Sequence, residues 1–187
     1  TNVFIEIQAD ENAIPTTSGG NLRVNGSNPI SIGPMASDAS ITRSWDITGI
    51  EAGNYNIRIK CNSTETGDVF SSPQTLQVND IIKPKWSNPT TSLTSPTIYS
   101  SGASYQFNLT WNDNVAISKV LIEHNFTGGP PQNYTVTNNE SNVFYYTWND
   151  LAAGTYIWKE YANDTSNNFN FTDQFIFIVN PVPTSMQ

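Results

Sequence analysis

Eight asparagines lie in the Asn-x-Ser/Thr pattern, with x other than proline, that accepts N-linked glycans. A chain rich in Asn and Thr forms some of these sequons by chance, so their positions matter as well as their number. Asn108 alternates with Phe107 and Leu109 and is expected to point outward from a strand. We expect several sequons to carry glycans, the alternative being a plain Asn-rich surface. The eight are Asn25, Asn62, Asn108, Asn125, Asn133, Asn139, Asn163 and Asn170.

Residue types that perform catalysis are scarce. His124 is the single histidine, and no serine and aspartate accompany it at a recognisable spacing, so we expect a histidine on the surface of a strand. Cys61 is the single cysteine, which excludes an internal disulfide and is expected to be a small, inward, inert thiol. The sequence therefore predicts neither an enzyme nor a cofactor.

Asp113 and Asp164 are the best candidates for a cation site. Both stand in Asn/Asp-rich turns that are expected to meet at one end of a domain, and carboxylate oxygens suit Ca²⁺. Neither turn has the dense alternation of carboxylates found in calcium loops. The simpler interpretation is that each carboxylate accepts hydrogen bonds from the backbone of its own turn, so no metal site is predicted.

The charge balance excludes some partners. The net charge is −8, and the 8 Lys and Arg form no basic patch, which argues against nucleic acid. Charged residues are only 13% of the chain, and the remaining polarity comes from Asn, Ser and Thr, which favours an exported protein. No apolar run reaches the roughly 18 residues of a membrane span. The chain opens at Thr1 without a signal-peptide pattern, as in a mature product or an excerpt.

Two stretches of the chain repeat at an offset of 101 residues. Residues 50–55 (IEAGNY) match 151–156 (LAAGTY), and the sequons at Asn62 and Asn163 then coincide. Apolar residues alternate throughout, and Gly, Pro, Asn and Asp clusters interrupt them at strand spacing. This pattern predicts an all-β protein of two tandem immunoglobulin-like antiparallel β-sandwiches, residues 1–80 and 84–180, with a C-terminal tail 181–187.

The Gly-x-Tyr step of each repeat predicts a tyrosine corner. Gly154 is expected to take a positive φ in a tight turn. Tyr156 then enters the next strand with its hydroxyl bonded to the turn backbone, and Tyr55 does the same in the first repeat.

These motifs also resemble a known family. Residues 151–156 followed by 162–164, together with residues 111–120 (WNDNVAISKV), are similar to the bacterial and archaeal Ig-like surface domains of the Big type. The resemblance covers most of residues 84–180 and about half of 1–79. It implies an extracellular sandwich used as a stalk, lattice or adhesion module, and it implies no chemistry.

Glu160 departs from the pattern. Inward positions after the tyrosine are Ile57, Ile59 and Cys61 in the first repeat, and Glu160 falls on one of them in the second. A buried carboxylate without a partner is costly. Either Lys119 or a tyrosine hydroxyl pairs with Glu160, or the strand is bulged or exposed there.

Large apolar side chains occupy both faces of two segments, 144–148 and 174–179. One face of each is expected to lie in the core. The other is expected to be a protein interface, with Ile176 and Ile178 as candidates, or a platform on which sugars stack.

The phase of the repeat suggests an incomplete first domain. Val3, Ile5, Ile7 and Ala9 align with the strand that ends at Trp111, so residues 1–80 would lack a first strand. One explanation is an excerpt of a longer repeat protein. The other is head-to-tail assembly of identical subunits, in which a neighbour's residues 181–187 lie beside Val3–Ile7, or residues 2–8 insert into the next subunit.

The function predicted from these features is an extracellular structural subunit of a surface filament or lattice. Its partners would be copies of itself and N-linked glycans, with Val3, Ile5 and Ile7 at the subunit interface. The alternative is an adhesin or carbohydrate-binding stalk module of a larger surface protein.

Overall fold

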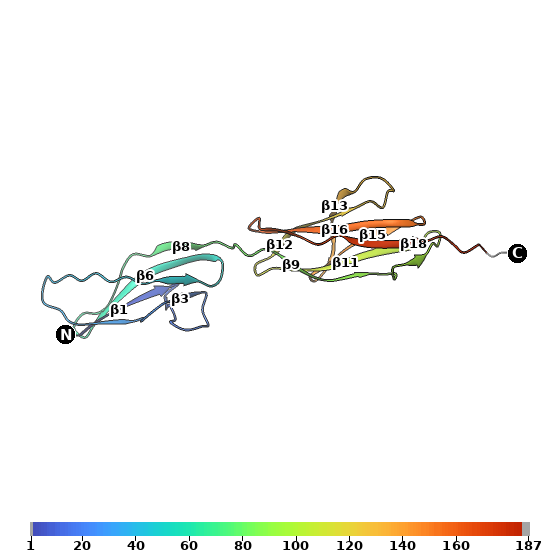
Figure 1. The fold of residues 1–187 in the computed structure, drawn as a ribbon. Helices are drawn as coiled ribbons and strands as arrows, with labels where there is room; N and C mark the ends of the chain where they lie inside the picture. The colour runs from blue at the N-terminus through green and yellow to red at the C-terminus, as the bar shows by residue number, and fades with distance from the viewer. Residues whose placement is uncertain (1, 185–187) are drawn as a thin grey trace. The chain divides into compact units, whose positions relative to one another are not determined.

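The computed structural model describes residues 2–184 and is all-β, as predicted. The chain divides into two compact units, residues 1–80 (domain one) and 81–187 (domain two). Domain one contains β1 (Asn2–Ala9), β2 (Asn12–Ala13), β3 (Leu22–Val24), β4 (Ile30–Pro34), β5 (Ile47–Gly49), β6 (Gly53–Ser63), β7 (Gly67–Phe70) and β8 (Gln74–Val78). Domain two contains β9 (Lys85–Thr91), β10 (Thr97–Ile98), β11 (Ser104–Asn112), β12 (Ile117–His124), β13 (Gln132–Val136), β14 (Asn138–Glu140), β15 (Val143–Asn149), β16 (Gly154–Asp164), β17 (Phe169–Phe171) and β18 (Phe175–Asn180). Figure 1 labels most of these strands along the ribbon.

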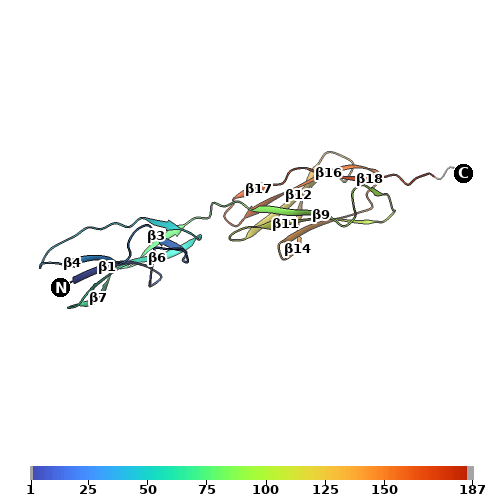
Figure 2. The same ribbon diagram turned by 60° about the horizontal axis from the view of Figure 1, so that its bottom comes forward.

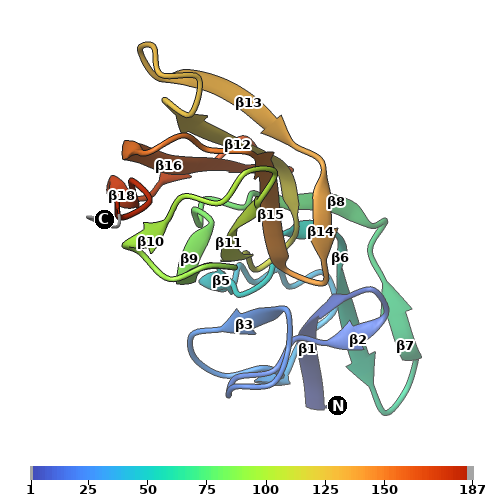
Figure 3. The ribbon, with the colours of Figure 1, turned by 90° about the vertical axis from the view of Figure 1, so that its right-hand side faces the viewer.

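Domain two is a closed sandwich of two sheets. One sheet has the order β14-β15-β11-β9, and the other has the order β10-β18-β16-β12-β13 with β17 attached to β16. Figure 3 shows the two sheets as separate layers. Pairing is antiparallel except between β10 and β18. This is the layered arrangement of an immunoglobulin-like sandwich.

Alternation along β11 builds the core of domain two. Its inward side chains are 1% exposed or less: Tyr105, Phe107, Leu109 and Trp111. They pack against the inward side chains of β12 and β16, such as Ile122 and Trp158. Because side chains of a strand alternate between its faces, the four aromatic and aliphatic residues at period two assign one whole face of β11 to the core.

Domain one repeats the sheet that contains the Gly-x-Tyr strand. Gly53 pairs with Val78 as Gly154 pairs with Val179, so β6 and β8 correspond to β16 and β18 at the offset of 101. On its other side β6 pairs with β1, which also pairs with β2 and β4. Figure 2 shows β4, β1, β6 and β7 side by side.

The alignment of Val3–Ala9 with β11 was wrong. β1 lies beside β6 and corresponds to β12, since Ile7 pairs with Ile59 where Ile122 pairs with Glu160. Among the described residues of domain one there is therefore no counterpart of β9 or β11, so two strands are missing rather than one. Period-two alternation marks a strand but cannot say which strand it is, because every half-buried strand of a sandwich shows it.

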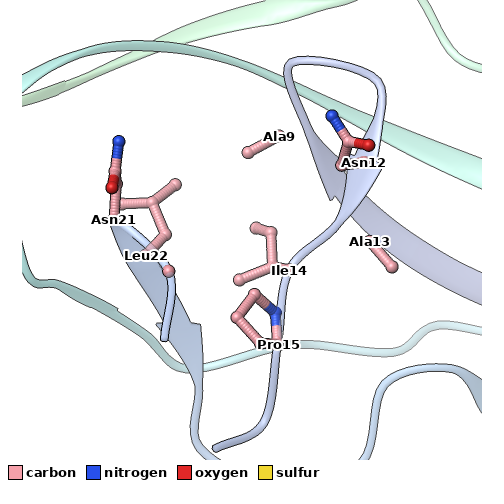
Figure 4. Close-up of a pocket in the computed structure, with 8 residues that line it drawn as sticks. Ala9, Asn12, Ala13, Ile14, Pro15, Asn21 and Leu22 are labelled. Atoms are coloured by element: carbon pink, nitrogen blue, oxygen red, sulfur yellow. The ribbon is translucent and has the colours of Figure 1, made fainter. Parts of the chain in front are cut away.

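The second layer of domain one is reduced to the two-stranded sheet of β3 and β5. Leu22 and Val24 of β3 cover one end of the large sheet, where Ile7 and Tyr55 are buried with them. Figure 4 shows Leu22, Ile14 and Pro15 around a small pocket at this end, with Ala9 across it. Five residues form the buried apolar core here, against fourteen in domain two, so domain one has much less hydrophobic stabilisation.

Candidate functional site

Both tyrosines form the hydrogen bond of a tyrosine corner. Tyr55 Oη donates to the carbonyl of Glu51 at 3.0 Å, and Tyr156 Oη donates to the carbonyl of Ala152 at 2.9 Å. Gly154 does not have the expected positive φ. A Cβ there would lie 3.4 Å from Tyr156 Oη, so the glycine makes room for the tyrosine ring against the turn.

The eight sequons differ in their surroundings. Asn25, Asn133 and Asn139 are exposed, and the other five asparagines are half-buried. Asn125 Oδ1 accepts a hydrogen bond from the backbone of Ile157, and Asn170 Nδ2 donates to the carbonyl of Pro84 at 2.7 Å. Asn108 points outward as expected, with Nδ2 3.3 Å from Thr90 Oγ1.

Asn62 and Asn163 occupy equivalent positions near the C-terminal ends of β6 and β16. Asn62 lies opposite Asp68 and donates to its carboxylate, which also binds Lys60 Nζ at 3.0 Å. These two hydrogen bonds lower the pKa of the Asp68 carboxyl, and the bond from Asn62 has the larger effect. Asn163 lies opposite Phe169 instead. The same sequon thus stands in a charged environment in domain one and in an aromatic one in domain two.

The inner face of the large sheet in domain one is partly open. A groove of about 410 Å³ runs along it, and the side chains at its base are half-buried: Val3, Ile5, Ile59 and Cys61. The rim comes from the segment that leads to β5, with Met35, Ile41 and Trp45. In domain two β11 covers the corresponding face. We call the groove on the open face of domain one the acceptor groove.

The structure contradicts two placements of a donated strand. β1 pairs with β6 along its whole length on one edge and with β2 and β4 on the other. No additional strand fits beside Val3–Ile7 within the sheet, and residues 2–8 cannot leave without removing a central strand. The open position faces the sheet from across the core.

The other interface candidates lie on β18. Ile176 is 59% exposed, and Ile178 is half-buried with its N–H bonded to Ser95 Oγ. Phe144, Tyr146 and Trp148 of β15 pack on the core, while Tyr145 faces outward into a shallow groove with Thr90, Gln106, Asn108 and Glu140.

Glu160 is fully buried, and its strand is not bulged there. The partner is neither Lys119 nor a tyrosine, because Trp111 Nε1 donates to Glu160 Oε2 at 2.9 Å. Burial raises the pKa of Glu160 to about 8, against the opposite effect of the Trp111 hydrogen bond. The side chain is therefore a neutral carboxylic acid at pH 7. The indole N–H of Trp111 is a suitable donor, and it reaches Glu160 from β11 on the opposite sheet. The sequence did not reveal this placement of β11.

His124 is buried and does not lie on the strand surface. It is 1% exposed, and its ring stacks between Phe126 and Tyr134 with centroids 4.0 and 4.4 Å away. Burial lowers its pKa to about 4, so it is uncharged at pH 7. His124 has the same parity as Val120 and Ile122, and that alternation could have identified it as inward.

Asp113 and Asp164 do meet at one end of domain two, with carboxylate oxygens within 4.8 Å of each other. Asp164 Oδ1 accepts hydrogen bonds from the backbone of Ser166 and Asn168, and Asp113 Oδ2 accepts one from Val115. Both carboxylates thus bond their own turns, in the way expected of turn aspartates.

No protein-family model matches the chain, and a search of curated proteins found no match. Within residues 2–184 there is no helix long and apolar enough to cross a membrane. Among solved structures, the chain is similar to fibronectin(III)-like modules of CbhA from Clostridium thermocellum, with 14% identity, 95% of this chain and 78% of that chain covered, and a TM-score of 0.39. It is also similar to the FN1–FN3 domains of chicken CNTN1, with 11% identity, 96% and 56% covered, and a TM-score of 0.35. At these scores neither match bears on function.

Proposed function

We propose that the protein is a non-enzymatic extracellular structural subunit of a cell-surface filament or lattice, and that the acceptor groove is where neighbouring subunits join. The observation that carries the proposal is the contrast between two equivalent faces. β11 of domain two buries Phe107, Leu109 and Trp111 over its sheet, while Ile5, Ile59 and Cys61 of domain one are left half-covered. An apolar face of this kind gains free energy when a strand covers it.

The groove also offers a polar anchor for a strand. Trp45 Nε1 is buried and has no hydrogen-bond partner among the described residues. Backbone carbonyls of an incoming strand are suitable acceptors, and satisfying a buried donor removes a cost of about 1–3 kcal/mol. The neighbouring strand β5 spans only Ile47–Gly49 and supplies a ladder for additional pairing.

The donor that we propose is the tail 181–187 of a second copy. Residues 181–184 are exposed and outside the strands, Val182 is 58% exposed, and residues 185–187 lie outside the described part of the chain. Pro181 and Pro183 lack an N–H, but alternate residues of a strand face the same edge. The N–H groups of Val182 and Thr184 remain available to β5, while the proline edge faces solvent.

Sedimentation velocity across a concentration series tests the proposal. The intact chain should form a series of linear oligomers, and the chain without residues 181–187 should sediment as a monomer. Ile41→Glu on the groove rim should also prevent assembly, whereas Ile81→Glu, at a side chain that is 82% exposed outside the groove, should not. A strictly monomeric intact chain, or polymers that survive both changes, would contradict the proposed joint.

One observation favours the second candidate function, a carbohydrate-binding stalk. The shallow groove on the outer face of domain two combines one aromatic ring, Tyr145, with amide and carboxyl side chains of Gln106, Asn108 and Glu140. Sugars stack on aromatic rings and bond to such groups. A glycan array in which Tyr145→Ala abolishes binding by a monomeric chain would favour this function over the filament.

A further inference from the structure

Three aromatic rings form a cluster on the outer face of domain two. Tyr161 of β16 lies 5.8 Å from Phe169 and 6.1 Å from Phe171 between ring centroids, and the two phenylalanines lie 6.1 Å apart. Phe169 is 45% exposed and Phe171 is 55% exposed. We call these three residues the ring cluster. Contiguous exposed apolar side chains are typical of surfaces that bind a ligand or a partner.

Asn163 lies beside this cluster. It pairs directly with Phe169 across the β16–β17 ladder, and Tyr161, two residues earlier, points to the same face of the sheet. No hydrogen bond of its amide exists among the described residues, and Thr165, the hydroxyl residue of its sequon, is exposed. The acceptor nitrogen of the sequon is therefore free and lies next to the rings.

One ring of the cluster, that of Tyr161, is held in place by its neighbours. Tyr161 Oη donates to Glu123 Oε2 at 2.6 Å, and Lys159 Nζ lies 4.9 Å from the Tyr161 ring centroid while pairing with Glu123 at 3.5 Å. A ring fixed in this way binds a partner without losing side-chain freedom, which lowers the cost of the contact.

We propose that Asn163 carries an N-linked glycan and that the ring cluster forms the seat on which the first sugars of this glycan pack. The donor is an oligosaccharide linked to a lipid diphosphate. Asn163 Nδ2 forms a bond to the anomeric carbon, the bond from that carbon to the diphosphate oxygen breaks, and the lipid diphosphate leaves with the electron pair while the amide loses one proton. The C–H face of the attached sugar then packs on Phe169 and Tyr161 and covers them.

The equivalent site in domain one lacks such a seat. Asn62 faces Asp68, and Lys60 replaces Tyr161. Phe70, the counterpart of Phe171, has the Arg58 guanidinium 4.3 Å above its ring centroid. A glycan on Asn62 has no free ring to contact. The two sequons are therefore a matched pair, of which only Asn163 has the ring cluster beside it.

The test uses the full chain secreted from an N-glycosylating host, with glycopeptide mapping to assign occupancy and calorimetry to follow each domain. Thr165→Ala removes the Asn163 sequon, and Thr64→Ala removes the Asn62 sequon. Neither threonine side chain makes a hydrogen bond among the described residues, so both changes delete little except the glycan.

We expect Asn163 to be occupied and Thr165→Ala to lower the melting temperature of domain two by about 4 °C, the shift of a weak stacking contact in a domain of this size. Phe169→Val, which removes the ring without creating a sequon at Asn167, should remove most of that difference, and Thr64→Ala should leave domain one within about 1 °C. Without glycosylation, the intact chain and Thr165→Ala should melt together. An empty Asn163 beside other occupied sequons, or a glycan effect that Phe169→Val does not reduce, would overturn the proposal.

Discussion

Each domain contains an equivalent large sheet, and the two domains differ in the strands that cover this sheet. In both, the Gly-x-Tyr strand pairs with the last strand in the same register and has an equivalent asparagine one residue before its end. Domain two places β11 and β9 over this sheet, and domain one places only β3 and β5 there. The sheet with the tyrosine corner thus forms under either a full or a reduced second layer. The extent of that second layer determines whether the domain is a closed sandwich.

The buried ionisable groups follow the same division. Glu160 and His124 stand in domain two where domain one has Ile59 and Ala9. Both depend on the thick aromatic core for their burial, since Trp111 bonds Glu160 and Phe126 stacks on His124. Closure therefore gives domain two a pH dependence that domain one should lack.

The comparison is tested most strongly by emptying the centre of domain two. Phe107→Ala should destabilise it by about 4 kcal/mol, because the ring is fully buried and packs on Phe126, Trp158 and Phe177. Calorimetry should show one transition moved down by roughly 15 °C or more and the domain-one transition unchanged. Equal movement of both transitions would mean that the domains do not unfold independently.

Glu160→Gln should stabilise domain two at neutral pH. The pKa of Glu160 is raised from 4.5 to about 8, so between these values the unfolded chain ionises and the folded one does not. Stability from this group is complete below pH 4.5 and falls as pH rises, by roughly 3 kcal/mol at pH 7. Urea unfolding should show the variant and the original chain converging at pH 4.5 and separating by pH 7. A constant difference between them would rule out the buried neutral acid.

His124 should act in the opposite direction on the acid side. Its pKa is lowered from 6.5 to about 4, so stability is lost as pH falls through this range, by roughly 2–3 kcal/mol. The effect is measured by urea unfolding in the Glu160→Gln background, where the opposing titration of Glu160 is absent. His124→Phe should remove it. Domain one, which has the non-titrating Ala9 at the position equivalent to His124, is the internal control.

The smallest effect concerns the feature that the domains share. Tyr156→Phe and Tyr55→Phe each remove one hydrogen bond to a turn carbonyl, and each should cost about 1 kcal/mol in its own domain. Similar losses in chemical denaturation of the two variants would support a corner that is independent of the covering layer. A loss confined to Tyr156 would tie the corner to the closed core.

The sequence predicted the parts of the fold that follow from local pattern. Strand positions in domain two, the repeat offset and the two Gly-x-Tyr steps all depend on alternation and turn residues within short segments. It failed where the answer lay across the core. Identifying β1 required knowledge of its pairing with β6, and identifying the partner of Glu160 required the position of β11. Finding the ring cluster required the register of β17 against β16.

The central claim, that the acceptor groove receives the tail of a second copy, is tested most directly by cross-linking to Cys61. This is the only cysteine of the chain and lies at the base of the groove. Under mild oxidation Val182→Cys or Thr184→Cys should give a ladder of disulfide-linked chains on a non-reducing gel. Pro183→Cys, on the opposite face of the donated strand, and Val115→Cys, an exposed site in domain two, should give none beyond a trace. Equal cross-linking at all four positions, or at none of them, would contradict the account.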